Sequence, residues 1–114
     1  MWIVGVLMDD MLRVLVIIPA YNAGQTIGRC LDSVLQSVQQ APVEIICVDD
    51  GSKDNTGMIL DMLTQKDHRV RALLLARNYG HQVALTCGMD HSQGNAVITM
   101  DGDMQHPPEM IPLL

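Results

Sequence analysis

Four short runs of aliphatic and β-branched residues recur along the chain at nearly regular intervals. The runs are Arg13–Ile18, Val43–Val48, Val70–Leu75 and Ala96–Met100, so that successive starts lie 30, 27 and 26 residues apart. The first two runs contain unbroken apolar stretches, which are typical of strands covered on both faces, whereas a half-exposed strand alternates. We therefore predict four strands, with the first two in the interior of a sheet.

The segments between these runs carry apolar residues at the three- and four-residue spacing of a helix face. They are Gly24–Gln40, Asn55–Gln65 and Tyr79–Ser92. The first segment has the most complete apolar stripe. In the second segment, Asp54 or Asn55 is available as the N-cap of the helix. The third stripe includes Ala84 and Gly88 and is less apolar. Strand and helix alternating in this way predict βαβ units with right-handed crossovers, and hence an α/β domain whose mostly parallel sheet has helices on both faces.

The length of 114 residues suits about one domain, and a hydrophobic content of 48% is enough for it to bury a core. We assign residues 13–114 to this domain and treat residues 1–12 as a leader or an untypical N-terminal extension. The chain ends in Pro-rich sequence that begins a further helix, from Pro107 onwards. We therefore expect the α/β domain to be truncated.

The charge balance limits the partners of this chain. A formal net charge of −6 argues against a protein that holds nucleic acid mainly by neutralising phosphates. No apolar run approaches the roughly 18 residues of a membrane span. Cys30, Cys47 and Cys87 have neither a C-x-x-C spacing nor a spacing suited to zinc, so we expect buried thiols in a reducing compartment.

Acidic residues follow two of the predicted strands. Asp49 and Asp50 follow the second run, and Asp101 and Asp103 follow the fourth. Since ligands of open parallel sheets bind at the carboxyl ends of the strands, both clusters are expected at one crevice. Their mutual repulsion is relieved if a cation lies between them.

The sequence Asp101-Gly102-Asp103-Met104-Gln105 places oxygen donors at alternate positions of a turn. Such donors suit a hard cation, Mg²⁺ or Mn²⁺, although a solvated acidic turn has the same composition. An EF-hand loop is excluded because His106 and Pro112 stand where Gly and Glu are required. The phosphate-binding glycine patterns of P-loop and dinucleotide-binding proteins are absent as well. A metal-dependent phosphohydrolase remains an alternative.

Four segments in this order resemble one known family. They read VIIPAYN at Val16–Asn22, VDDGSKDNT at Val48–Thr56, RNYGHQ at Arg77–Gln82 and MDGDMQHPPE at Met100–Glu109. Together they resemble the family 2 glycosyltransferases, and within them the branch of dolichol-phosphate mannose synthase and bactoprenol glucosyltransferase. The resemblance covers about residues 13–114.

The resemblance implies a GT-A fold whose N-terminal half binds a nucleoside-diphosphate sugar, UDP- or GDP-linked. It implies that Pro19, Ala20 and Tyr21 line the nucleoside, and that Asp50, with Asp49, contacts the base or ribose. Arg77 would lie near the phosphates. Asn78 and Gly80 would shape their loop, and His81 would lie on the surface or be partly packed. By the same resemblance, Asp101, Asp103 and Gln105 are the metal and diphosphate site, in which Asp101 and Asp103 also serve catalysis.

The implied reaction is sugar transfer with inversion, at the cytoplasmic face of the membrane or in the cytoplasm. The branch points to a polyprenyl phosphate as acceptor. A saccharide hydroxyl as acceptor, or a nucleotide-binding module without turnover, are the alternatives. Two departures from the family pattern are Ala23-Gly24, where relatives often carry an acidic residue, and Gly102 in place of Ala. Because the chain ends just after the metal motif, we expect it to be inactive in transfer by itself.

Overall fold

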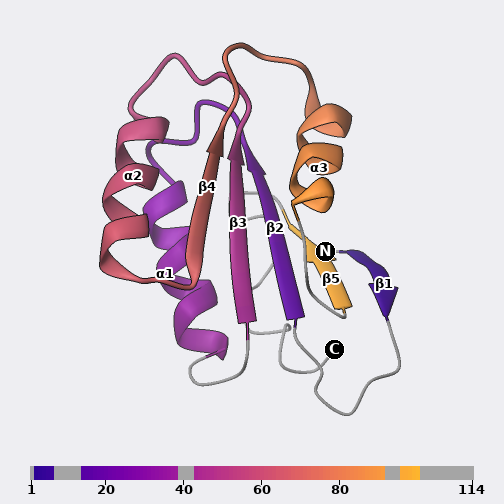
Figure 1. Ribbon diagram of the computed structural model, residues 1–114. Helices are drawn as coiled ribbons and strands as arrows, with labels where there is room; N and C mark the ends of the chain where they lie inside the picture. Colours follow the sequence, from indigo (N-terminus) through magenta and orange to yellow (C-terminus); the bar gives the residue numbers. More distant parts are fainter. Residues whose placement is uncertain (1, 7–13, 39–42, 92–95, 101–114) are drawn as a thin grey trace.

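The computed structural model describes residues 2–6, 14–38, 43–91 and 96–100. Within these ranges the chain forms five strands and three helices (Figure 1). In chain order they are β1 (Trp2–Val6), β2 (Val14–Ala20), α1 (Ile27–Val38), β3 (Val43–Asp49), α2 (Thr56–Lys66), β4 (Val70–Leu74), α3 (His81–Asp90) and β5 (Ala96–Thr99).

The strands form one sheet in the order β1-β5-β2-β3-β4. β5, β2, β3 and β4 run parallel to one another, which confirms the predicted parallel sheet of four strands. β2 and β3 lie inside the sheet, as their unbroken apolar sequences predict. From β2 the chain moves to β3 and β4 on one side and then returns to β5 on the other. The strand order thus reverses at β2, and a reversal of this kind opens a crevice at the carboxyl ends of the strands.

β1 was not predicted. The sequence analysis sets residues 1–12 apart as a leader or extension, whereas the structure pairs Trp2–Val6 with β5 in antiparallel register, Trp2 opposite Thr99. The reason is that an antiparallel edge strand needs no crossover helix. It therefore lacks the regular strand-helix spacing from which the other four strands are predicted.

The two faces of the sheet are covered by different helices, with α1 and α2 on one face and α3 on the other (Figure 1). Successive side chains of a strand point to opposite faces. Val16 and Ile18 accordingly pack in the larger cluster with α1 and α2, while Leu15 and Ile17 pack with α3. All four side chains are fully buried. This accounts for the absence of alternation in the β2 sequence.

Each helix begins one to three residues after the start of its predicted segment, because local contacts fix where it begins. α1 begins after a tight turn in which the Ala23 carbonyl accepts the N–H groups of Thr26 and Ile27. At α2, Asn55 occupies the N-cap position without a side-chain hydrogen bond, and Asp54 Oδ1 instead accepts the N–H of Thr56. A side-chain hydrogen bond from Thr56 lowers the pKa of Asp54. Among the described residues, no helix is long and apolar enough to cross a membrane.

Two of the three cysteines are fully buried. Cys30 on α1 and Cys47 on β3 belong to the larger core cluster, as expected of buried thiols. Burial raises the pKa of the Cys47 thiol, with a smaller contribution from Cys30. Cys87 on α3 is only partly buried, which departs from the prediction.

Gly88 lets α3 lie close to the sheet. A Cβ at this position would lie 2.7 Å from Ile17 Cγ2 and 3.3 Å from Val48 Cγ2. Gly88→Val is therefore expected to lower the free energy of unfolding by about 1–3 kcal/mol through overpacking. Urea denaturation followed by circular dichroism measures the loss. Met89→Val, at an exposed position of the same helix, is the control and should change stability by less than about 0.5 kcal/mol. Equal stabilities of the two variants would contradict this contact.

The ion pair between Asp67 and Arg69 closes the turn from α2 to β4. Arg69 Nη2 lies 2.9 Å from Asp67 Oδ2, and hydrogen bonding from Arg69 lowers the pKa of Asp67 from 3.8 to about 2. A lowered carboxyl pKa contributes stability above the unfolded-state value that is lost as the pH falls through the folded-state value.

Asp67→Asn is therefore expected to cost at most about 1 kcal/mol at neutral pH, because the pair lies near the surface. The difference from the wild type should shrink as the pH falls from about 4 towards 2, which denaturation at several pH values measures. The exposed Asp90→Asn serves as the control. A difference that stays constant across this pH range would mean that the pair contributes nothing through charge.

Candidate functional site

At the carboxyl edge of the sheet, the loop after β2 is hydrogen-bonded to the loop after β3. Asn22 has a positive φ of 49°, and its N–H donates to Ser52 Oγ over 2.8 Å. In return the N–H of Lys53 donates to Asn22 Oδ1, also over 2.8 Å. An Asn tolerates this backbone conformation better than most residues. These bonds fix the two loops to one another.

A second group of bonds continues the same loop pairing. Thr56 Oγ1 accepts the N–H of Ala23 at 2.9 Å, and Asp54 Oδ2 accepts the N–H of Gly24 at 3.0 Å. A Cβ on Gly24 would lie 2.0 Å from Asn55 Oδ1 and 2.9 Å from Asp54 Oδ2, so a larger residue here would displace these side chains. The Ala23-Gly24 pair, which departs from the family pattern, thus fits the loop that lies against it.

Asp49 and Asp50 are both buried but face different sides of the sheet. Asp49 Oδ1 accepts the N–H of Ser52 at 3.0 Å, and its Oδ2 would lie 3.1 Å from a Cβ on Gly57 at the start of α2. Asp50 faces the other way, towards α3. Its Oδ1 accepts the N–H of Tyr79 at 2.8 Å, and its Oδ2 accepts that of Gly80 at 3.0 Å. Of the two, only Asp50 is among the residues that line the pocket described next.

A pocket of about 300 Å³ opens at this edge between the end of β2, the end of β3 and the start of α3. Four of its residues were predicted as nucleoside-binding, namely Pro19, Ala20, Tyr21 and Asp50. The remaining four come from the segment before α3 and from its first turn, namely Asn78, Gly80, His81 and Ala84. The structure thus brings the predicted residues at the ends of β2 and β3 together with residues of 78–84. These form the other wall of the pocket and were not predicted to belong to the site.

One feature of the sequence could have assigned residues 78–84 to the pocket. The Arg77–Gln82 string runs into the start of a helix that follows a parallel strand, so the start of that helix must lie at the carboxyl edge. Asn78 and Gly80 were predicted to shape the loop, and His81 was predicted to lie on the surface or to be partly packed. His81 is exposed, as expected, yet it lines the pocket.

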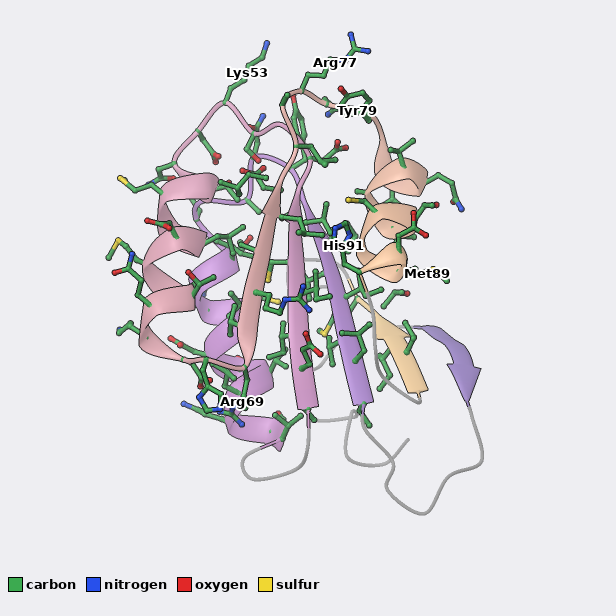
Figure 2. The ribbon with its side chains drawn as sticks, viewed as in Figure 1. Lys53, Arg69, Arg77, Tyr79, Met89 and His91 are labelled. Carbon is green, nitrogen blue, oxygen red and sulfur yellow. The ribbon has the colours of Figure 1, made fainter. Side chains whose placement is uncertain are left out.

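Arg77 directly precedes Asn78, which lines this pocket, but Arg77 is not itself among the lining residues. Its guanidinium carbon is 4.8 Å from the centroid of the Tyr79 ring, within the range of a cation–π contact. Figure 2 shows Arg77, Tyr79 and Lys53 at the upper edge of the molecule, beyond the carboxyl ends of the strands. A cation is therefore present at this edge of the sheet.

Asp101, Asp103 and Gln105, the predicted metal site, lie outside the described residues. The last described residue before them is Met100, whose N–H donates to the carbonyl of Ile17 over 3.0 Å. Because β5 is parallel to β2, the chain leaves β5 at the carboxyl edge, on the opposite side of β2 from Asp49 and Asp50. The part of the chain that the structure describes has no group of three His, Cys, Asp or Glu residues suited to a metal ion.

Comparison with known proteins shows which family has this sequence pattern and fold. The profile of the family described as "Glycosyl transferase family 2" matches residues 15–114. This chain belongs to glycosyl transferase family 2. Among curated family members, it is 40% identical over 105 residues to an undecaprenyl-phosphate 4-deoxy-4-formamido-L-arabinose transferase of Proteus mirabilis. That match covers 90% of this chain and 32% of the relative, so the chain spans about a third of the relative's length.

Solved structures of two proteins with nucleotide sugars bound share the fold. The mannosyltransferase PcManGT from Pyrobaculum calidifontis, in complex with GDP-Man and Mn²⁺, superposes with a TM-score of 0.76 at 26% identity, over 87% of this chain and 30% of the other. TarS of S. aureus, residues 1–349 in complex with UDP-GlcNAc, has a TM-score of 0.70 at 27% identity, over 81% of this chain and 27% of the other. The predicted GT-A fold is thereby confirmed.

Proposed function

We propose that this chain is the donor-binding part of a metal-dependent glycosyltransferase, which moves a sugar from a UDP- or GDP-sugar to a polyprenyl phosphate with inversion. The observation that carries the proposal is the pocket at the carboxyl edge of the sheet, in which Pro19, Ala20, Tyr21 and Asp50 converge. Support for a nucleotide-sugar donor comes from the ligands of the two structural neighbours, GDP-Man and UDP-GlcNAc.

In this proposal the pocket takes the nucleoside. Pro19 and Ala20 end β2 and supply an apolar wall, while Tyr21 is 45% exposed and offers a ring on which a base can stack. Asp49 supports the site from the opposite face of the sheet by holding the loop that begins at Ser52. Arg77, next in the chain to Asn78 of the pocket, is suited to the diphosphate because a guanidinium makes paired, charge-assisted hydrogen bonds with phosphate oxygens.

Asp101, Asp103 and Gln105 would hold the divalent ion. The donor set fits Mg²⁺ or Mn²⁺, because it consists of carboxylate and amide oxygens, and the strand before it ends at the pocket edge. Asp49 and Asp50 hold the neighbouring loops by accepting backbone N–H groups, and the proposal assigns the metal to the later cluster. When bound, such an ion stabilises the negative charge that develops on the departing nucleoside diphosphate.

A polyprenyl phosphate suits this reaction as the acceptor, because its phosphate oxygen is already anionic near neutral pH and needs little help from a general base. The proposal draws on the printed name of the Proteus relative, an undecaprenyl-phosphate sugar transferase. It places the reaction at the cytoplasmic face of a membrane.

Tyr21→Ala tests the pocket assignment. Loss of base stacking is expected to weaken UDP or GDP binding roughly tenfold, since stacking contributes about 1–3 kcal/mol per base. Tyr21→Phe keeps the ring and should bind like the wild type. Isothermal titration with both nucleotides measures the affinities. Unchanged binding by Tyr21→Ala would place the nucleoside elsewhere.

A turnover assay separates the transferase from its alternatives. Incubation of a nucleotide sugar with polyprenyl phosphate and Mn²⁺ is expected to release nucleoside diphosphate only when the acceptor and the rest of the enzyme are present. Hydrolysis of the donor's diphosphate to a nucleoside monophosphate and a sugar 1-phosphate, without any acceptor, would instead indicate a phosphohydrolase. Transfer to a saccharide hydroxyl and not to the lipid phosphate would overturn the proposed acceptor.

A further inference from the structure

We infer that Thr56 is a positioning residue for Tyr21. Its hydroxyl group joins the backbone of Ala23 to the carboxylate of Asp54, and this holds the loop after β2 so that the Tyr21 ring stays in the pocket. The inference deepens the proposed function and rests on it for the identity of the ligand. It gives a role in donor binding to a residue that is not among those lining the pocket.

Three successive backbone N–H groups that follow Tyr21 donate to side chains of residues 52–56. They are the N–H groups of Asn22, to Ser52 Oγ at 2.8 Å, of Ala23, to Thr56 Oγ1 at 2.9 Å, and of Gly24, to Asp54 Oδ2 at 3.0 Å. Successive N–H groups in a turn can form a site for an anion. Here a carboxylate and two hydroxyl groups of the protein already accept them, so their effect is to place the loop.

Thr56 is the fully buried member of this set. Its Oγ1 accepts the N–H of Ala23, and the same hydroxyl donates to Asp54 Oδ1 over 2.5 Å. A hydroxyl group can accept and donate at one atom, whereas a valine of the same shape can do neither. Valine at this position would leave the Ala23 N–H without its acceptor, which costs more than the bond itself contributes.

Tyr21 lies between two anchored parts of the backbone. Before it, the carbonyl of Ala20 accepts the N–H of Asp50 at 2.8 Å. After it, Ala23 packs against the larger core cluster, and its N–H is bound to Thr56. The Tyr21 side chain itself is 45% exposed, so packing covers only part of it and the backbone on either side determines where the ring lies. Release of Ala23 should therefore move the ring.

Two other roles for Thr56 lead to different expectations. Direct contact with the nucleotide is unsuited to a fully buried side chain that does not line the pocket. A role in stability alone would lower the melting temperature but leave the nucleotide affinity of the folded protein unchanged. A positioning role lowers the affinity, and does so only while the Tyr21 ring is present.

Thr56→Val tests the inference. We expect the affinities for UDP and GDP, measured by calorimetric titration below the melting temperature, to fall about fivefold, and Thr56→Ser to restore them. Thr64→Val is the matched control, because it removes a hydroxyl of the same helix that donates only to the carbonyl of Asp61, and it should bind like the wild type. Unchanged affinity in Thr56→Val would overturn the inference.

A double variant shows whether the effect passes through Tyr21. Because stacking on the ring is already lost in Tyr21→Ala, adding Thr56→Val to that variant should lower the remaining affinity by less than about twofold. A further fivefold loss in the double variant would mean that Thr56 acts on the nucleotide by another route, and would overturn the inference.

NMR of the nucleotide-free protein gives a readout that does not depend on binding. The chain has two tyrosines, so the Tyr79 ring serves as an internal reference for Tyr21. In Thr56→Val the ring signals of Tyr21 should shift while those of Tyr79 stay in place. The pKa of Asp54 should rise, because the hydrogen bond from Thr56 is the main cause of its lowered pKa. Unshifted Tyr21 signals, or an unchanged pKa of Asp54, would overturn the inference.

A second variant covers the case in which Thr56→Val does not fold. Ser52→Ala removes the acceptor of the Asn22 N–H, directly after Tyr21, and should weaken the binding of both nucleotides and shift the Tyr21 signals. The absence of both effects would overturn the inference. A folded wild type that binds neither nucleotide would refute the proposed function, while the Tyr21 signals would still test whether Thr56 positions the ring.

Discussion

Replacing Gly51 with alanine is expected to lower the free energy of unfolding by about 3 kcal/mol. Two costs add up at this position. Gly51 has a φ of 71°, which a residue with a Cβ adopts only at a cost of about 1–2 kcal/mol. The new Cβ would also lie 2.1 Å from the backbone of Arg77, and overpacking of this kind costs about 1–3 kcal/mol. The atoms nearest this Cβ belong to the backbone of Arg77 and Asn78, so the chain at these two residues must move. Nucleotide binding should weaken as well, because Asn78 lines the pocket.

Gly28→Ala is the matched control for this substitution. It lies in α1, and a Cβ there has no atom within 4 Å. Alanine is expected to stabilise this position by about 0.5–1 kcal/mol, because glycine is the poorer helix former. Urea denaturation of both variants measures the contrast. If Gly51→Ala proved as stable as Gly28→Ala, the close approach of the two loops would be refuted.

The second large effect is expected at Asp103. Under the proposed function, Asp103→Asn should weaken Mn²⁺-dependent binding of a UDP- or GDP-sugar by at least tenfold, because it removes a charged metal ligand. The melting temperature should stay the same or rise, since one of several neighbouring carboxylates loses its charge. Binding without metal should change little.

Two measurements decide this prediction. Calorimetric titration with and without Mn²⁺ gives the affinities, and a thermal melt of the same samples gives the stability. Asp90→Asn, at the exposed end of α3, controls for the loss of one negative charge. A large drop in melting temperature for Asp103→Asn would show that the aspartate has a structural role and would count against the metal site.

The regular part of the fold could be predicted because its signals are local. The unbroken apolar runs in β2 and β3 follow from burial on both faces, and the Ile27–Val38 stripe follows from burial on one. The parallel order follows from the helix that joins each pair of strands. These features depend on residues a few positions apart, which a single sequence displays.

The pocket could be predicted only in part. Half of its lining residues lie in 78–84, and this part of the chain meets Asp50, about thirty residues earlier, only in the folded structure. Asp49 and Asp50 look equivalent in the sequence. Adjacent residues at a strand end point to opposite faces, so Asp49 meets the α2 side and Asp50 meets the start of α3. Only the sheet order reveals which helix lies on which face. β1 was missed for a related reason, since its pairing with β5 leaves no periodic signal.

The central claim is that this chain binds a nucleoside-diphosphate sugar through a divalent ion at the carboxyl edge of its sheet. Titration with UDP- and GDP-sugars, each with Mn²⁺ and with a chelator, tests it most directly. The account predicts saturable binding of one of these donors that is strengthened by Mn²⁺ and lost in Asp103→Asn. A folded sample that binds none of these donors under either condition would contradict it.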